Sequence, residues 1–217
     1  NIDLFEEEAS RYVNRKYALA VNSGTSALHL SLISLGIKKD DVVLCPSFTF
    51  AASANVVLYQ NATPVFIDVN LETWTIDLIA LEKAIKKNKP KAIITVDLYG
   101  QMCNYDRIIE LCKKYKLFLI EDAAESLGST LNKKQAGTFG DFGTFSFQAT
   151  KSVTTGEGGM ITTRKPQSHF KKLSMIRNHG VDKKRYFHIL PGSNFRLTNL
   201  QAAIGYSQLK RINFFKN

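Results

Sequence analysis

Segments with the length and apolar character of strands alternate with helical segments along the first 120 residues or so, and this alternation limits the fold more than any other feature. Five strands are predicted, at residues 17–21, 42–45, 63–68, 92–98 and 117–120. Helices are predicted before and between them, at residues 3–16, 27–35, 77–87 and 105–116, with another ending near residue 60. Strands joined through helices form right-handed crossovers, so we predict an α/β fold with a mainly parallel sheet flanked by helices.

Four short stretches each follow directly after a predicted strand. They are residues 24–26, Phe50, Asp122 and residues 146–151. In a sheet of this kind, the carboxyl ends of the strands form the crevice in which ligands bind. We therefore expect the four stretches to converge on one edge of the sheet.

The first stretch is suited to binding a phosphate. Gly24, Thr25 and Ser26 follow a short strand and begin an apolar helix. A helix N-terminus presents free backbone N–H groups and the positive end of the helix dipole to an anion. The alternative is ordinary capping of the helix by Ser23 or Thr25, which would need no ligand.

The next two stretches suit a flat, nitrogen-containing ring. Phe50 follows a predicted strand and is a candidate for stacking on such a ring, with core packing as the alternative. Asp122 comes just after a buried strand and before two alanines, so its carboxylate is a candidate for holding a proton on a ring nitrogen. The alternative for Asp122 is a helix N-cap.

The fourth stretch surrounds a single lysine. Two β segments are predicted, at residues 143–147 and 159–163, and the loop between them is rich in Thr and Gly. Lys151 carries the only amine between residues 141 and 157, a setting that favours a Schiff-base lysine over a solvated one. Ser146 is a candidate phosphate ligand. The alternative is a β-hairpin with an incidental lysine. Helices are predicted beyond it, at residues 166–177 and 200–211.

Composition narrows the function classes. The 217 residues are 44% hydrophobic, which is typical of one globular domain, and no apolar run is long enough to span a membrane. The net charge of +10 comes from basic residues in scattered short groups, which indicate a solvated surface and no nucleic-acid partner. Three cysteines without a CxxC pair indicate reduced thiols in the cytoplasm and no metal site.

Seven blocks of the chain resemble, in the same order, those of the DegT/DnrJ/EryC1/StrS family of sugar aminotransferases, which use pyridoxal 5′-phosphate (PLP). These blocks are VNSGTSALHL, PSFTFAASAN, TPVFIDV, LYGQ, IEDAAESLGS, FSFQATKSVTTGEGGM and NFRLTNLQAAIGYSQL. The resemblance implies the large domain of the aspartate aminotransferase (type I PLP) fold. It also implies that residues 1–217 lack the family's N-terminal segment and its smaller C-terminal domain.

The resemblance also implies roles for single residues. Lys151 would bond covalently to PLP, and Asp122 would hold the pyridine nitrogen. Phe50 would stack on the ring, and Glu125 stands where many members have Gln beside the phenolic oxygen. The phosphate would be bound by Gly24, Thr25 and Ser146, joined by Asn194 from the neighbouring subunit of a homodimer.

The implied reaction moves an amino group from a donor, expected to be glutamate, to a keto group, expected at C4, of a nucleotide-linked sugar in surface polysaccharide or amino-sugar biosynthesis. The segment of residues 177–196, with His179, Arg185 and His188, is the candidate for contacts to the sugar or its diphosphate. The main alternative is an inactive, truncated paralogue that acts as a PLP-binding or dimerisation module. A nicotinamide- or ATP-binding enzyme is disfavoured because GxGxxG and GxxxxGK[ST] are both absent.

Overall fold

A computed structural model of the protein describes residues 1–182, 184 and 186–215, and it contains a seven-stranded sheet in the order β1-β9-β8-β5-β4-β2-β3. β9 is antiparallel to both of its neighbours, whereas the β2–β3, β2–β4, β4–β5 and β5–β8 pairs are parallel. The predicted α/β fold with a mainly parallel sheet is therefore confirmed. The strands are β1 (Tyr17–Val21), β2 (Val42–Pro46), β3 (Thr63–Ile67), β4 (Ala92–Val96), β5 (Phe118–Asp122), β8 (Phe142–Ser146) and β9 (Gly159–Thr163).

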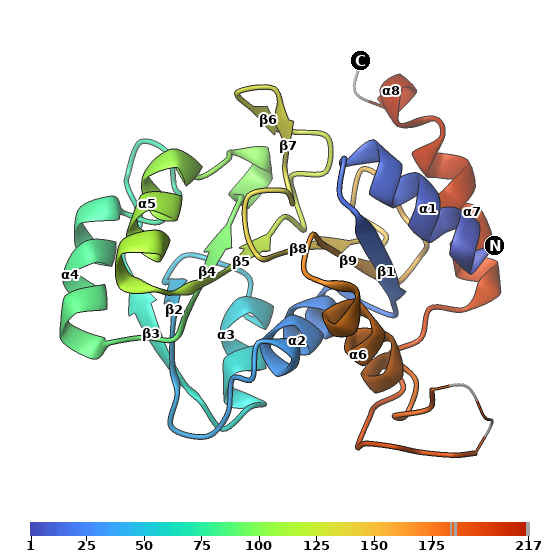
Figure 1. The fold of residues 1–217 in the computed structure, drawn as a ribbon. Coiled ribbons are helices and arrows are strands. Elements are labelled where there is room, and N and C mark those ends of the chain that lie inside the picture. Colours follow the sequence, from blue (N-terminus) through green and yellow to red (C-terminus); the bar gives the residue numbers. More distant parts are fainter. Residues whose placement is uncertain (183, 185, 216–217) are drawn as a thin grey trace.

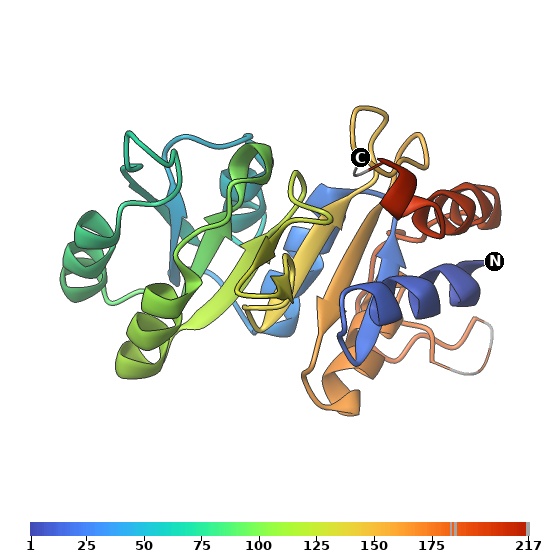
Figure 2. The same ribbon diagram turned by 90° about the horizontal axis from the view of Figure 1, so that it is seen from above.

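Helices cover both faces of the sheet (Figures 1 and 2). One face carries α2 (Gly24–Ser34), α3 (Ala52–Leu58) and α6 (Gln167–Arg177). The other face carries α1 (Ile2–Tyr12), α4 (Leu78–Asn88), α5 (Tyr105–Tyr115) and α7 (Asn199–Leu209), and α8 (Ile212–Phe215) follows α7. Within the described ranges, no helix combines the length and the apolar character needed to cross a bilayer.

The strands contribute alternate residues to two hydrophobic cores. Leu19 and Val21 of β1 pack into the core beneath α2, whereas Ala18 and Ala20 belong to the core on the opposite face. The pleat of a strand sends successive side chains to opposite faces, so a strand covered on both sides must be apolar throughout. This explains why the predicted strands are continuous apolar runs.

Some boundaries differ from the prediction. β5 extends two residues further than expected, so Glu121 and Asp122 are its last residues, and β4 ends at Val96. A small hairpin, β6 (Thr130–Leu131) with β7 (Lys134–Gln135), was not predicted because two-residue strands have no detectable period. The 3-10 turn η1 (Leu98–Gly100) follows β4.

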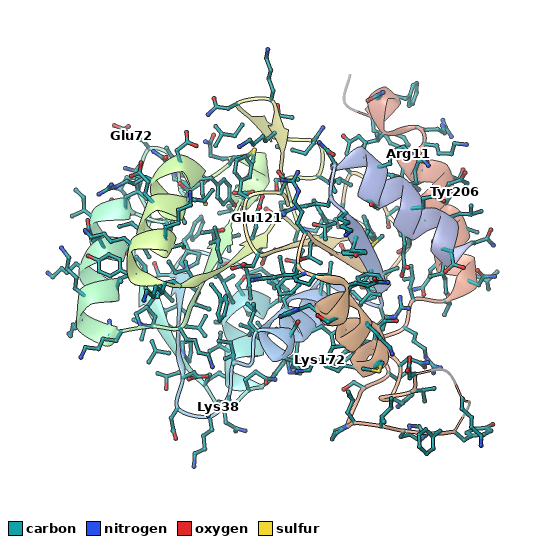
Figure 3. All side chains as sticks on the ribbon, in the orientation of Figure 1. Arg11, Lys38, Glu72, Glu121, Lys172 and Tyr206 are labelled. Atoms are coloured by element: carbon teal, nitrogen blue, oxygen red, sulfur yellow. The ribbon has the colours of Figure 1, made fainter. Side chains whose placement is uncertain are left out.

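Two buried carboxylates brace the centre of the molecule. Glu121 is fully buried and lies in the interior in Figure 3. It accepts hydrogen bonds from the backbone N–H groups of Gly137, Phe139 and Gly140. Asp97, just after β4, accepts from the Cys103 N–H at 3.0 Å and from the Tyr105 and Ser126 hydroxyls at 2.8 and 3.3 Å. Their partners tie the loops after β4 and β5 to the sheet.

The first prediction concerns pH. Burial raises the pKa of Asp97 from 3.8 to about 6, above its unfolded value. The folded state therefore binds this proton more tightly, and the stabilisation is lost as pH rises through 6. Between pH 5 and 8, the free energy of unfolding should fall by about 1 kcal/mol on this account.

Urea unfolding of Asp97→Asn measures this contribution. The amide can accept from Cys103 and Tyr105 and can donate to Ser126, so the variant should fold. Its decline in unfolding free energy between pH 5 and 8 should be shallower than that of the unsubstituted protein. Parallel pH profiles for the two proteins would contradict the assignment.

The second prediction concerns α7, which packs against α1. A Cβ at Gly205 would lie 2.6 Å from the Phe5 ring and 2.8 Å from the Thr155 methyl group. Helix propensity favours alanine over glycine by about 1 kcal/mol, whereas overpacking costs about 1–3 kcal/mol. Gly205→Ala should therefore lower the unfolding free energy, while Ser207→Ala at an exposed position of the same helix should not. A stabilised Gly205→Ala variant in chemical denaturation would show that the helices do not meet this closely.

Candidate active site

A cavity of about 570 Å³ lies at the carboxyl ends of the strands, within the usual size range of small-molecule sites. Seven of the residues predicted to form a site line this one cavity: Gly24, Thr25, Phe50, Asp122, Glu125, Ser146 and Lys151. They come from four separate stretches of the chain, as the strand-end argument predicts. Ser23, Leu28, Thr49, Ala52, Val96, Leu98, Ala124, Gln148, Thr150 and Glu157 complete the lining.

One end of the cavity is built for an anion. Ser23 caps α2 by accepting from the Ser26 N–H, and the N–H groups of Gly24 and Thr25 belong to the first turn, where an α-helix offers no internal acceptor. A Cβ at Gly24 would lie 3.0 Å from the Cβ of Ser146. The first turn of α2 therefore meets the end of β8 closely enough for the Ser146 hydroxyl to share a ligand with these N–H groups.

Ser26 is placed differently from Gly24 and Thr25. It is buried and is not among the residues that line the cavity. Its hydroxyl donates to Asn22 Oδ1 at 2.7 Å and lies 3.0 Å from the Ser23 hydroxyl. In this arrangement, the Ser26 side chain supports the turn that presents Gly24 and Thr25.

Asp122 is the last residue of β5 and is buried beside the cavity. Its Oδ2 accepts from the Ser53 hydroxyl at 2.8 Å, and its Oδ1 accepts from the Ala124 N–H at 3.2 Å. Burial raises the pKa of Asp122, while these hydrogen bonds and the charge of Lys151 oppose the rise. No helix begins here, so Asp122 is not a helix N-cap. A raised pKa suits a carboxyl group that shares a proton with a ligand.

Sequence reasoning missed Ser53. It lies on α3, three residues after Phe50, and is completely buried. A serine in an Ala- and Val-rich helix gives no signal in one sequence, because its role depends on a carboxylate 69 positions away. Its hydroxyl fixes the orientation of the Asp122 carboxylate.

Phe50 is 77% exposed although it lines the cavity. Core packing, the alternative weighed from the sequence, is therefore excluded for this ring. An exposed aromatic face at the cavity wall is available to stack on a flat ligand, and such contacts contribute about 0.5–1.5 kcal/mol beyond area burial.

Lys151 enters the cavity from the loop between β8 and β9. These two strands pair as antiparallel neighbours, so the hairpin considered as the alternative for this stretch does form. It carries Lys151 to the cavity. The Lys151 Nζ lies 3.1 Å from Glu125 Oε1, and Glu125 Oε2 accepts from the Tyr99 N–H at 2.9 Å. The lysine side chain is only 22% exposed. The amine is thus held at the cavity wall by a carboxylate that is itself fixed by η1.

Three further candidates, Asn194, His179 and His188, belong to the segment of residues 177–196. Asn194 Oδ1 accepts from Arg196 Nε at 3.0 Å, and the ring of His188 bonds to the His179 carbonyl at 2.7 Å. Neither Asn194 nor either histidine is among the cavity-lining residues. Arg185 lies outside the described residues. Within one chain, the described residues of the segment 177–196 are therefore not among those that line the cavity.

Together, the cavity offers donors for a phosphate, an aromatic face, a buried carboxylate and one amine. This is the set of groups that a phosphorylated, nitrogen-containing aromatic aldehyde requires. The residues present therefore fit PLP: Gly24, Thr25 and Ser146 are suited to bind its phosphate, and Asp122 and Lys151 are suited to meet its ring and aldehyde.

Comparisons with known proteins agree with this geometry. The chain is 46% identical over 209 residues to GDP-perosamine synthase from Caulobacter vibrioides, covering 96% of this chain and 56% of that protein. It is 42% identical over 214 residues to GDP-perosamine synthase from Escherichia coli O157:H7, covering 99% and 58%. The chain thus spans a little over half the length of these relatives.

Among solved structures, the PLP-form of a putative sugar aminotransferase, Spr1654 from Streptococcus pneumoniae, matches with a TM-score of 0.93 and 30% identity. The match covers 98% of this chain and 59% of that one. It confirms the predicted type of fold, and its PLP-form agrees with the expected cofactor. The model of the DegT/DnrJ/EryC1/StrS aminotransferase family matches residues 1–217. The chain therefore belongs to the DegT/DnrJ/EryC1/StrS aminotransferase family.

Proposed function

We propose that this protein is a PLP-dependent aminotransferase that moves an amino group onto a keto group of a nucleotide-linked sugar. The observation that carries the proposal is that Lys151 and Asp122 line one cavity together with the N-terminus of α2. Had the two side chains lain on opposite faces of the sheet, they could not have flanked one small ring. Residues 1–217 would form the large, cofactor-binding domain.

PLP, when bound, supplies an aldehyde that accepts amines and a ring that withdraws electrons from the reacting carbon. The residues of this chain supply binding, orientation and proton transfer. The N–H groups of Gly24 and Thr25 and the Ser146 hydroxyl would bind the phosphate, and Phe50 would cover one ring face. Asp122, oriented by Ser53, would hold a proton at the ring nitrogen.

Lys151 has two tasks in this mechanism. Its amine would hold the cofactor at the aldehyde, and it would move a proton at the reacting carbon. Glu125 lies 3.1 Å from this amine and would approach the phenolic oxygen of the ring. The Tyr99 N–H donates to Glu125 and fixes its carboxylate. The fixed carboxylate would in turn orient the Lys151 amine and the phenolic oxygen.

The substrate class comes from the relatives. Two of them are named for the synthesis of GDP-perosamine, an amino sugar linked to a nucleotide. We infer that the acceptor here is a keto sugar of the same class, aminated at C4, and that glutamate is the amino donor. Such a reaction belongs to surface polysaccharide or amino-sugar biosynthesis in the cytoplasm, which agrees with three free, buried cysteines.

A second copy of the chain is part of this proposal. Asn194 and the histidines of residues 177–196 do not line their own cavity, although they would suit a phosphate and a sugar. In a homodimer, this segment would reach the cavity of the neighbouring subunit. Asn194 would then contact the cofactor phosphate, and His179 and His188 would contact the sugar or its diphosphate.

The third prediction tests the role of Lys151. The protein should turn yellow on addition of PLP, and borohydride should bleach it and attach the cofactor to Lys151 permanently. Lys151→Ala should lose both responses because no other amine faces the cavity among its lining residues. Absorbance spectra and peptide mass spectrometry measure the outcome, with Lys172→Ala at an exposed position of α6 as the control.

Two outcomes separate the alternatives. A protein that never forms the coloured, reducible adduct is not a PLP enzyme. A protein that forms it but transfers no amino group from glutamate to a keto-sugar nucleotide is instead the PLP-binding module that the sequence left open.

The fourth prediction concerns Asp122. Asp122→Asn keeps an acceptor for the Ser53 hydroxyl but removes the negative charge that stabilises a protonated ring nitrogen. PLP should still bind to Lys151, while the absorbance change on adding glutamate should slow on the order of 100-fold or more. Ser53→Ala should have a smaller effect, because the carboxylate stays and keeps the Ala124 N–H. Unchanged rates in Asp122→Asn would remove Asp122 from the mechanism.

A further inference from the structure

The loop that carries Lys151, residues 147–158, is called here the lysine loop. Close to the lysine, its hydrogen bonds are local: the Lys151 N–H donates to the Gln148 carbonyl at 2.9 Å, and Thr150 donates to the Gln148 side chain. These bonds shape the turn but do not attach it to the rest of the fold. The Lys151 amine is held at its tip by Glu125, and Val153 of the same loop is buried in the core, whereas the backbone of the later part of the loop needs other partners.

Two glutamine side chains from α7 reach the later part of the lysine loop. The Thr154 N–H donates to Gln208 Oε1 at 2.9 Å. Gln201 Nε2 donates to the Glu157 carbonyl at 2.8 Å. The glutamines lie seven positions apart, about two helical turns, so they project from one side of α7. They bond to two backbone groups of the loop that no strand pairs, and the Glu157 carbonyl also accepts from the Thr155 hydroxyl at 2.7 Å.

Close packing brings α7 to the loop. Gly205, between the two glutamines, leaves room for the Thr155 methyl group and the Phe5 ring, each of which would lie under 3 Å from a Cβ there. Phe5 of α1 also packs on Phe147 at the start of the loop, with ring centroids 5.1 Å apart. The loop is thus held between the sheet and a helix that begins 48 residues after Lys151.

We infer that Gln208 and Gln201 are positioning residues for Lys151: through their hydrogen bonds to the lysine loop, α7 fixes the amine where it meets the cofactor aldehyde. The placement of the amine at the cofactor aldehyde rests on the proposed function. The anchoring itself is a property of the chain alone. Misplacing a reacting group by about 1 Å costs on the order of 100-fold in rate, so loss of one anchor should be measurable.

The contacts of the glutamines allow matched variants. Gln208→Glu keeps an oxygen acceptor for the Thr154 N–H, whereas Gln208→Met has a similar length and no such acceptor. Gln201 also caps α7, since its Oε1 accepts from the N–H and hydroxyl of Thr198. Gln201→Glu keeps the cap and removes the donor to Glu157, which separates anchoring from helix stability. Ser207→Ala is the control on the same helix.

The first measurement needs no cofactor. Hydrogen exchange of the backbone amides of residues 147–158 should be faster in Gln208→Met and Gln201→Glu than in the unsubstituted protein. Gln208→Glu and Ser207→Ala should exchange at the original rate. Thermal unfolding of the same variants checks that the whole fold has not loosened.

The second measurement compares two forms of the cofactor. PLP capture forms a C=N bond between Lys151 Nζ and the aldehyde carbon, and the aldehyde oxygen leaves as water with the two hydrogens of the neutral amine. Pyridoxamine phosphate carries an amine in place of the aldehyde and binds without this bond. Gln208→Met should capture PLP on the order of 10-fold more slowly while keeping its affinity for pyridoxamine phosphate, and Gln208→Glu should restore the rate.

The outcomes are distinct. Unchanged exchange and unchanged capture in Gln208→Met and Gln201→Glu would overturn the proposal. Equal losses of PLP capture and pyridoxamine phosphate affinity would also overturn it, because they indicate a collapsed pocket. If the unsubstituted protein captures no PLP at all, the proposed function fails, and the exchange rates still decide whether α7 anchors the loop.

Discussion

The common direction of β2, β4, β5 and β8 is the constraint on which the cavity depends. Parallel strands end at the same edge, so the residues that follow them meet although they are far apart in sequence. Glycines then allow contact between layers: a Cβ at Gly159 would lie 2.3 Å from the Ser23 carbonyl oxygen. The parallel strands therefore bring the site residues to one edge of the sheet. The lack of a side chain at Gly159 lets the N-terminus of α2 pack closely against that edge.

The pleat of β5 gives two neighbouring carboxylates different tasks. Glu121 faces a loop that supplies three backbone N–H donors, and Arg15 closes the same loop by donating to the Gly137 and Gly140 carbonyls. Asp122 faces the opposite side of the sheet, toward Ser53 of α3 and the cavity. Burial raises the pKa of both, but only Asp122 can meet a ligand. Glu121 therefore stabilises the fold, whereas the next residue, Asp122, lines the cavity.

Features with a local or periodic cause could be predicted from the sequence. The strands appear as apolar runs because both faces are covered. The helix predicted from residue 77 begins there because Asp77 caps α4 by accepting from the Ala80 N–H. Ser53 and Gln208 could not be found in this way. Each acts through one hydrogen bond to a partner more than 50 positions away, and neither residue type stands out in its helix. A hydrogen bond between residues far apart in the chain produces no periodic pattern in a single sequence.

The antiparallel direction of β9 explains why the lysine needs outside support. Because β8 ends and β9 begins at the cavity, the loop between them has both of its ends at the cavity. A connection between parallel strands would instead run through a helix to the other edge of the sheet. Such a loop can carry an amine to the cavity, but its middle residues have no neighbouring strand to bond with. A helix packed across it can supply side-chain partners for its backbone. The same strand reversal that places Lys151 at the cavity wall therefore leaves the backbone of its loop to be bonded by side chains of α7.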